Sequence, residues 1–204
     1  MTTKSPSPVT AVPSASTPSA WVTRFAGLVP PEGRVLDVAC GGGRHTRLFA
    51  GLGHPVTAID RDLAGVADLA GSSRPDGSGI ELIEADLQDG NPWPLEPDRL
   101  FAGVVVTNYL HRPLFPALLD LLEPGGVLIY ETFAWGNERF GKPSSPAFLL
   151  EQGELLDRVV GRLQVVAFEQ GVVDQPKPAV VQRLCAVASA LPHALPDPIP
   201  NHTK

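Results

Sequence analysis

The order of hydrophobic and polar residues predicts short strands and helices that alternate along the chain. Residues 35–39 (VLDVA) are apolar on both sides of Asp37, as expected of a short strand buried on both faces of a sheet. Residues 44–52 carry apolar side chains at helical spacing, which predicts a helix. Between them lie residues 40–43 (CGGG), where glycine allows the backbone to turn sharply. This stretch therefore predicts a strand, a glycine turn and the start of a helix.

The same alternation continues along the rest of the chain. Strands are predicted at about 55–60, 80–84, 101–107, 127–133, 163–170 and 179–187, and helices at 21–28, 62–70, 113–122 and 146–160. A loop is expected at 71–79 and a turn at 123–126, and the first helix is expected to pack against a sheet edge. The last two strands should form an antiparallel pair. Strands that alternate with helices through right-handed crossovers build a doubly wound sheet, so the fold class is α/β.

Length and composition suit one domain with two tails. The chain has 204 residues, enough for a single α/β domain with a sizeable core, expected at residues 21–188. Residues 1–20 are nearly all Ser, Thr, Pro, Ala and Val. They cannot bury enough apolar surface to offset the entropy of ordering, so we expect a disordered tail. Residues 189–204 are rich in proline and predict an extended or mobile tail.

Charge and cysteine content exclude several classes of protein. The formal net charge of −6 argues against a general nucleic-acid binder, which would usually carry a basic face. No apolar run is long enough to span a membrane, and none of signal-peptide length follows Lys4, so we expect a cytoplasmic protein without a membrane partner. Cys40 and Cys185 have no second cysteine at metal-ligand spacing, so neither a metal site nor a disulfide framework is predicted.

Three carboxylates follow or lie in successive predicted strands. Asp37 lies four residues before Gly41, Asp60 lies 23 residues after Asp37, and Asp86 follows the third strand. Each acid alone is more often a turn or capping residue, but three at this spacing are hard to attribute to capping. A strand, a glycine turn and a helix N-terminus make a nucleotide-type cofactor site. Dinucleotide enzymes place a further glycine where this chain has Thr46, which disfavours a nicotinamide cofactor.

The strand with Asp37 and its glycine turn resembles motif I of the class I S-adenosylmethionine-dependent methyltransferases. The segment LLEPGGVLIYETF resembles the element before and within the fifth strand of the same family, and the resemblance covers roughly residues 20–188. One difference is that the family usually has glycine where this chain has Ala39. The resemblance implies a Rossmann-like, seven-stranded sheet of order 3-2-1-4-5-7-6 in which the last strand is antiparallel. It also implies S-adenosylmethionine as the cofactor.

The resemblance assigns roles to the residues of the turn and of the strand ends. The acid and the glycine turn hold the methionine end of the cofactor. A carboxylate at the tip of the second strand can accept hydrogen bonds from both ribose hydroxyls. The acid after the third strand takes the adenine amino group, and the next backbone unit reads the ring edge. The predicted cofactor-binding residues are Asp37, Ala39, Cys40, Gly41, Gly43, Asp60, Asp86, Leu87 and Asn108.

The methyl acceptor is expected at the carboxyl ends of the fourth and fifth strands, where open parallel sheets bind ligands. Tyr109 is predicted to wall the methyl group. His111 is the candidate base because its unperturbed pKa lies near neutrality, and a surface pair that caps the next helix is an equal alternative for it. Residues 134–143 form a loop with two glycines that could act as a lid. The strand end lacks the Asn/Asp-Pro-Pro-Tyr signature of methyltransferases that act on nucleobase or glutamine amino groups.

Charged residues near these strand ends leave further alternatives open. Arg139 and Lys142 could meet an anionic acceptor, or simply lie in a solvated loop. His45, on the first turn of the helix after the glycine turn, could touch the methionine carboxylate or the acceptor. Arg44 is interpreted as a residue that faces solvent.

The leading hypothesis is a methyltransferase that acts on a small-molecule acceptor. The segment GRHT after the glycine turn is similar to the tellurite-resistance and thiopurine methyltransferase group, which act on small soft or thiol-like acceptors. A second hypothesis is an RNA or protein methyltransferase whose binding face contains His111, Arg112, Arg139 and Lys142. A third is a non-catalytic cofactor-binding or scaffold protein, and a nicotinamide oxidoreductase is a fourth. The oligomeric state stays open.

Overall fold

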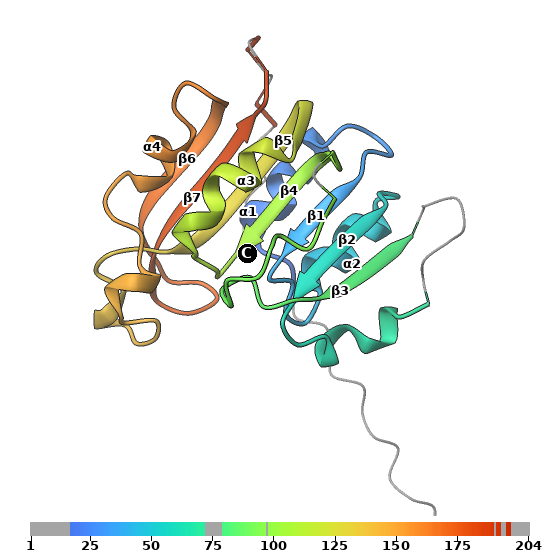
Figure 1. Cartoon of the computed structure of the whole chain (residues 1–204). Coiled ribbons are helices and arrows are strands. Elements are labelled where there is room, and N and C mark those ends of the chain that lie inside the picture. The colour runs from blue at the N-terminus through green and yellow to red at the C-terminus, as the bar shows by residue number, and fades with distance from the viewer. Residues whose placement is uncertain (1–16, 72–78, 97, 190, 193–194, 197–204) are drawn as a thin grey trace, which may run out of the picture.

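The computed structural model describes residues 17–71, 79–96, 98–189, 191–192 and 195–196, which build one sheet with helices on both faces (Figure 1). The strands are β1 (Val35–Val38), β2 (Val56–Asp60), β3 (Ile80–Glu84), β4 (Phe101–Thr107), β5 (Leu122–Phe133), β6 (Gln164–Val173) and β7 (Ala179–Val187). The α-helices are α1 (Ala20–Phe25), α2 (Arg44–Gly51), α3 (Phe115–Asp120) and α4 (Glu154–Val159). The 3-10 helices are η1 (Ala26–Leu28), η2 (Ala64–Leu69), η3 (Arg112–Leu114), η4 (Asn137–Arg139) and η5 (Pro146–Phe148).

The sheet has seven strands in the order β3-β2-β1-β4-β5-β7-β6, which confirms the order that the sequence resemblance implies. β1 pairs in parallel with β2 and β4, and β7 pairs antiparallel with β5 and β6. The carboxyl ends of the parallel strands therefore meet at one edge of the sheet, the lower edge in Figure 1. Ligands of open α/β sheets bind outside this edge.

Both faces of the sheet are covered by apolar packing. On one face, Trp21 and Phe25 of α1 and Phe49 of α2 are buried in one hydrophobic cluster. On the other face, α3 and α4 supply Leu118 and Leu155 to the second cluster. All seven residues of β4 are buried, as expected of a central parallel strand with helices on both sides. The run of apolar residues that predicted this strand thus reflects its position in the middle of the sheet.

The predicted helix at 21–28 exists as α1 and η1, but its expected place at a sheet edge is wrong. It packs on the face of the sheet, in the same cluster as Ile129 and Cys185 of the central strands β5 and β7. The indole nitrogen of Trp21 also donates a 3.2 Å hydrogen bond to the carbonyl of Leu184 in β7. Packing on the face of the sheet buries more of the apolar surface of α1 than packing beside an edge strand would.

Three predicted helices are shorter or tighter in the structure. The segment 62–70 forms only the 3-10 helix η2, where a Cβ on Gly65 would lie 3.1 Å from the carbonyl oxygen of Gly41. The segment 113–122 contains the end of η3, then α3 and the start of β5, because Leu122 already pairs with Phe101 of β4. The segment 146–160 is divided into η5 and α4 by an extended stretch in which Leu150 bridges to Ala134.

The predicted tails and loops fall largely outside the described residues. Residues 1–16 and 197–204, and residues 72–78 of the predicted loop, are not described. Ser19 and Ala20, which the sequence analysis assigned to a disordered tail, are part of the fold: Ser19 is buried and caps α1 by accepting a hydrogen bond from the amide of Trp21. No helix in the described part of the chain is long and apolar enough to cross a membrane.

Candidate active site

The turn between β1 and α2 has left-handed backbone at three residues. The φ angles of Ala39, Gly41 and Gly43 are 54°, 52° and 70°. A Cβ on Gly43 would lie 2.4 Å from a methyl group of Val66, so only glycine fits there. Ala39 has a Cβ at a position where the resembling family usually has glycine, and a non-glycine residue in this region costs roughly 1–2 kcal/mol. The fold therefore maintains strain at this turn.

Asp37 lies buried beneath the turn. The hydroxyl of Thr46 donates a 2.6 Å hydrogen bond to its carboxylate. Burial raises the pKa of Asp37 to about 6, although the bonds from Thr46 oppose this rise. Since Asp37 is buried and bonded to the first turn of α2, it fastens that helix to the end of β1.

Asp60 joins the tip of β2 to the glycine turn. One carboxylate oxygen accepts a 2.8 Å hydrogen bond from the amide of Gly41, and the other accepts a 3.1 Å bond from the amide of Asp62. A carboxylate has about four lone-pair sites, so Asp60 can still accept further hydrogen bonds from a ligand. The predicted glycine turn and the predicted acid of the second strand are thus in direct contact.

The third predicted acid lies at the end of β3. The carboxylate of Asp86 accepts a 2.9 Å hydrogen bond from the amide of Gln88 and is otherwise exposed. The side chain of Gln88 donates a 3.3 Å hydrogen bond to the phenolic oxygen of Tyr109, which follows β4. This bond links the segments after β3 and β4.

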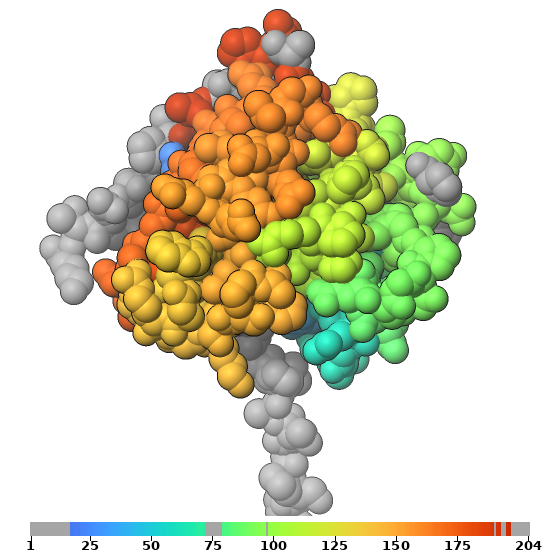
Figure 2. All heavy atoms as spheres, turned by 60° about the vertical axis from the view of Figure 1, so that its left-hand side comes forward, coloured from blue at the N-terminus to red at the C-terminus, as the bar shows by residue number. Residues whose placement is uncertain are grey.

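A cavity of about 540 Å³ opens at the carboxyl ends of β1 to β5. Its size is ordinary for a site that binds a cofactor or a small molecule. It is lined by Ala39, Asp60, Arg61, Ala85, Asp86, Leu87, Gln88, Asn108, Tyr109, Leu110, Thr132, Phe133, Pro143 and Phe148. Figure 2 shows the surface hollowed between the gold and orange residues of the segments after β5 and the cyan and green residues after β2 and β3. The structure thus brings residues from five strand ends around one space.

Six of the predicted site residues line this cavity: Ala39, Asp60, Asp86, Leu87, Asn108 and Tyr109. Asn108 has left-handed backbone, with a φ of 55°, and its amide donates a 2.9 Å hydrogen bond to the carbonyl of Glu131. Strained residues such as Ala39 and Asn108 gather at functional sites when the surrounding structure enforces them. Both line the same cavity.

Five other predicted residues are not among those that line the cavity: Asp37, Cys40, Gly41, Gly43 and His111. Cys40 is a buried free cysteine, and burial raises the pKa of its thiol to about 12, so the thiol stays protonated. His111 is half-buried, and its carbonyl accepts a hydrogen bond from the amide of Leu114. The catalytic role of His111 stays a prediction from the sequence.

Arg112 is neither a free cation nor a helix cap. Its guanidinium donates hydrogen bonds of 2.9 and 2.8 Å to the two carboxylate oxygens of Glu154. Arg158 donates a further 2.7 Å bond to the same carboxylate, which is 7% exposed. Arg139 and Lys142 are exposed on the loop after β5, as in the solvated-loop alternative.

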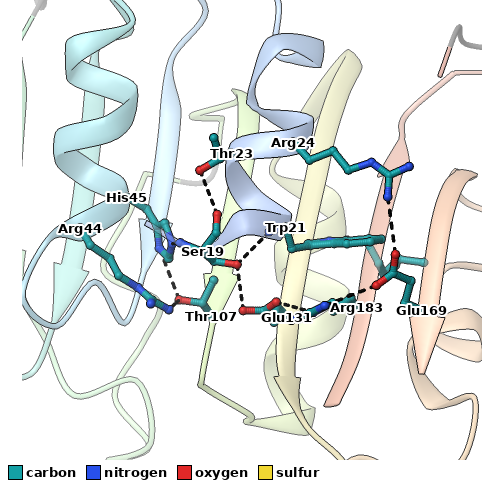
Figure 3. Close-up of polar contacts among 11 residues, drawn as sticks. Ser19, Trp21, Thr23, Arg24, Arg44, His45, Thr107, Glu131, Glu169 and Arg183 are labelled. Carbon is teal, nitrogen blue, oxygen red and sulfur yellow. Dashed lines mark hydrogen bonds and ion pairs between the residues drawn. The ribbon is translucent and has the colours of Figure 1, made fainter. Parts of the chain in front are cut away.

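A polar cluster that the sequence analysis missed lies on the opposite face of the sheet from Glu154 (Figure 3). The amide of Ser19 donates a 3.1 Å hydrogen bond to His45, and its hydroxyl donates a 2.9 Å bond to Glu131. Arg183 donates a 2.6 Å bond to the other carboxylate oxygen of Glu131. A serine just before an apolar helical segment is an N-cap signal, which could have indicated that α1 begins at this position.

His45 and Arg44 complete this cluster. Burial, and to a smaller extent the charge of Arg44, lowers the pKa of His45 to about 3, so the imidazole is neutral. Its second nitrogen lies 3.4 Å from the hydroxyl of Thr107 at the end of β4. Arg44 donates a 3.4 Å bond to the same hydroxyl, so its interpretation as a residue that faces solvent is wrong. His45 contacts the N-terminal segment and β4.

The serine cap has a measurable role in stability. Ser19→Ala removes the N-cap of α1 and leaves one oxygen of the buried Glu131 with one partner fewer, so we expect a loss of about 1–2 kcal/mol in the free energy of unfolding. Urea denaturation measures this loss. Ser145→Ala is the matched control, because Ser145 is the N-cap of η5 but makes no side-chain capping bond. Equal stability of the two variants would show that the Ser19 contacts contribute nothing.

The described residues contain no group of three histidine, cysteine or carboxylate side chains placed to hold a metal ion.

Comparison with known proteins shows what the chain is similar to. Residues 35–126 match the family model of a methyltransferase domain, and no curated protein matches the sequence. Among solved structures, TehB from Haemophilus influenzae has a TM-score of 0.65 at 18% identity. The alignment covers 81% of this chain and 60% of TehB, so the chain spans less than two thirds of that protein.

Two further structures were solved with S-adenosylhomocysteine. The 1,6-didemethyltoxoflavin-N1-methyltransferase of Burkholderia thailandensis has a TM-score of 0.59 at 21% identity, over 83% of this chain and 76% of that one. The glycopeptide N-methyltransferase MtfA has a TM-score of 0.56 at 20% identity, over 85% of this chain and 90% of that one. Residues 35–126 thus match a methyltransferase domain, and the sheet order and the structural neighbours show the Rossmann-like methyltransferase fold.

Proposed function

We propose that the chain binds S-adenosylmethionine in the cavity at the strand ends and methylates a small-molecule acceptor. The observation that carries this proposal is the single cavity that joins Asp60 and Asp86 to Asn108 and Tyr109. The two carboxylates can accept the hydroxyl and amino hydrogens of a nucleoside, and their negative charge favours a cation such as a sulfonium. Relatives of this fold that were solved with S-adenosylhomocysteine support the same choice of cofactor.

The residues around the cavity suit the ribose, adenine and methionine moieties of this cofactor. Asp60 has free lone pairs for ribose hydroxyls beyond the two amides that it already accepts. Asp86 and Leu87 line the same cavity, where the carboxylate of the first and the backbone of the second would suit the adenine edge. The amides of the glycine turn and the N-terminus of α2 favour a carboxylate such as that of the methionine moiety. Ala39 and Asn108 line the same cavity.

Methyl transfer from this cofactor depends more on how the acceptor is aligned than on acid, base or nucleophilic catalysis by side chains. When bound, the cofactor supplies an electrophilic methyl group on a positively charged sulfur. The residues at the ends of β4 and β5 orient the acceptor in line with this group and exclude water, which are the main contributions an enzyme makes to such a displacement. Tyr109 and Asn108 are fixed by contacts to Gln88 and Glu131, so this wall is preorganised.

A small-molecule acceptor fits better than RNA or a protein. The second hypothesis needs a basic face made by His111, Arg112, Arg139 and Lys142. Arg112 is already paired with Glu154, and the whole chain carries a formal charge of −6. The cavity volume is that of a small-molecule site, and the toxoflavin methyltransferase is a relative by fold that acts on a small molecule.

Calorimetry tests the proposal. We expect S-adenosylhomocysteine to bind with micromolar-range affinity and NAD far more weakly, because the turn has Thr46 where dinucleotide enzymes have their further glycine. A methyl acceptor screen with labelled S-adenosylmethionine then tests turnover. NAD affinity equal to that of S-adenosylhomocysteine would contradict the proposal and favour an oxidoreductase. Tight cofactor binding without any methyl transfer would favour a non-catalytic protein.

A further inference from the structure

We propose that the methyl acceptor is an uncharged aromatic molecule that stacks on Phe148 at the mouth of the cavity. This inference rests on the proposed methyltransferase function and specifies the substrate class of the same site. It assigns Phe148 as a residue that determines specificity. Three observations support it: the distribution of charge in the cavity, the way Phe148 is held, and the protonation state of Tyr109.

Charge is confined to one half of the cavity. The charged lining residues Asp60, Arg61 and Asp86 all follow or end β2 and β3. None of the described lining residues after β4 or at and after the end of β5 is charged; they are Asn108, Tyr109, Leu110, Thr132, Phe133, Pro143 and Phe148. An ionised acceptor would lose hydration here without gaining an opposite charge from any of these side chains, and S-adenosylhomocysteine, whose sulfur is neutral, supplies none at the methyl position either. The acceptor half therefore selects an uncharged molecule.

Phe148 is exposed, and the backbone on both sides of it is held in place. Its side chain is 47% exposed although it lines the cavity. The guanidinium of Arg112 donates a 3.1 Å hydrogen bond to the carbonyl of Ala147 and a 2.8 Å bond to the carbonyl of Leu149. Arg112 thus binds the backbone on both sides of the phenylalanine.

Arg112 is itself fixed by a buried carboxylate. Glu154 accepts two hydrogen bonds from Arg112, one from Arg158 and one from the amide of Glu151. The ion pair between Arg112 and Glu154 does not bury the ring of Phe148, which stays exposed. It does fix the backbone on both sides of Phe148, so less backbone order has to be gained when a flat partner binds to the ring. Stacked aromatic rings gain energy beyond the area that they bury.

The acceptor half offers no general base among its described lining residues. Tyr109 has the only ionisable side chain there, and burial raises the pKa of its phenol, with Asp86 and Asp60 adding to the rise. Its hydroxyl therefore stays protonated at neutral pH and can donate a hydrogen bond but cannot take a proton. The nucleophile is then a neutral lone pair, such as that of an aromatic nitrogen.

The electrons and protons balance without a protein base. The lone pair of the acceptor forms the bond to the methyl carbon while the carbon–sulfur bond breaks and its electron pair stays on sulfur. The positive charge moves from sulfur to the acceptor. Where the nucleophile carries a hydrogen, this proton leaves afterwards to water through the open mouth of the cavity.

Two probes with the same ring system and different charge test the inference. Protein saturated with S-adenosylhomocysteine is titrated with 2-naphthol, which is neutral at pH 7, and with 2-naphthoate, an anion, and binding is followed by NMR. We expect 2-naphthol to bind at least roughly tenfold more tightly, because the site cannot pair the anion. Phe148→Ala should weaken 2-naphthol binding roughly tenfold, and Phe148→Tyr should restore it.

Phe140→Ala is the matched control, because Phe140 also lies between β5 and α4 and is 43% exposed but is not among the lining residues. It should change 2-naphthol binding less than about twofold. All variants should bind S-adenosylhomocysteine as the unaltered protein does. Failure of the unaltered protein to bind S-adenosylhomocysteine would contradict the proposed function. If it does bind, any one of three results would overturn this inference. They are the absence of saturable 2-naphthol binding, equal binding of 2-naphthoate, and normal 2-naphthol binding by Phe148→Ala.

Discussion

Glu154→Gln is expected to lower the free energy of unfolding by about 3 kcal/mol, as is typical when one partner of a buried ion pair is removed. The glutamine leaves Arg112 and Arg158 without their counter-charge, and its amide group faces at least one guanidinium. Urea denaturation measures the loss. Asp157→Asn is the control, because Asp157 is exposed on the same helix α4. Equal stability of the two variants would contradict a structural role of the Glu154 cluster.

The same carboxylate should make stability depend on acid pH. Despite the opposing effect of burial, the bonds from Arg112, Arg158 and the amide of Glu151 lower the pKa of Glu154 from 4.5 to about 2. A depressed pKa contributes stability that is fully present above the unfolded value and is lost as the pH falls through the folded one. Between about pH 5 and pH 2 the unaltered protein should therefore lose about 3 kcal/mol relative to Glu154→Gln. Parallel stability curves for both proteins over this range would refute the assignment.

Asp60→Ala is expected to weaken S-adenosylhomocysteine binding roughly 100-fold, since hydrogen bonds to a charged group contribute about 1.5–3 kcal/mol. The variant loses the acceptor for ribose hydroxyls and also the bond that fixes the amide of Gly41. Calorimetry measures the affinity. Thermal unfolding should show only a small change, because Asp60 is only half-buried.

Asp62→Ala is the control for this measurement. Asp62 lies two residues after Asp60 and caps the amide of Ala64, but it is not among the cavity-lining residues. We expect its cofactor affinity to match that of the unaltered protein. If Asp60→Ala also binds the cofactor normally and keeps its melting temperature, Asp60 is only a turn residue.

The strands and the glycine turn were predictable because their signals are local. β4 spans Phe101–Thr107, the range predicted from its apolar run, and the chain turns where residues 40–43 supply three glycines. The acids at the ends of β2 and β3 line one cavity because parallel strands end at one edge of the sheet. Strands and turns depend on the conformational preferences of residues that are adjacent in the sequence, so the sequence alone predicts them.

The helix limits and the roles of the charged residues were less predictable. The segment 146–160 has helical spacing, but Leu150 joins Ala134 in a bridge and α4 begins only at Glu154. The sequence assigned Ser19 to a tail, yet its hydroxyl bonds to Glu131, 112 residues away. No local pattern indicates a partner so distant along the chain.

The sequence by itself determined the fold class and, by resemblance, the strand order. Five of the nine residues predicted to bind the cofactor line the cavity, and their role stays a prediction. Only the tertiary structure decided that Arg112 holds the backbone around Phe148 and is paired with Glu154, 42 residues later. It also decided that His111 lies outside the set of residues lining the cavity, while Phe148 is in it. The physical reason is that strands and turns arise from steric preferences of adjacent residues, whereas the partner of a charged side chain depends on which elements pack side by side.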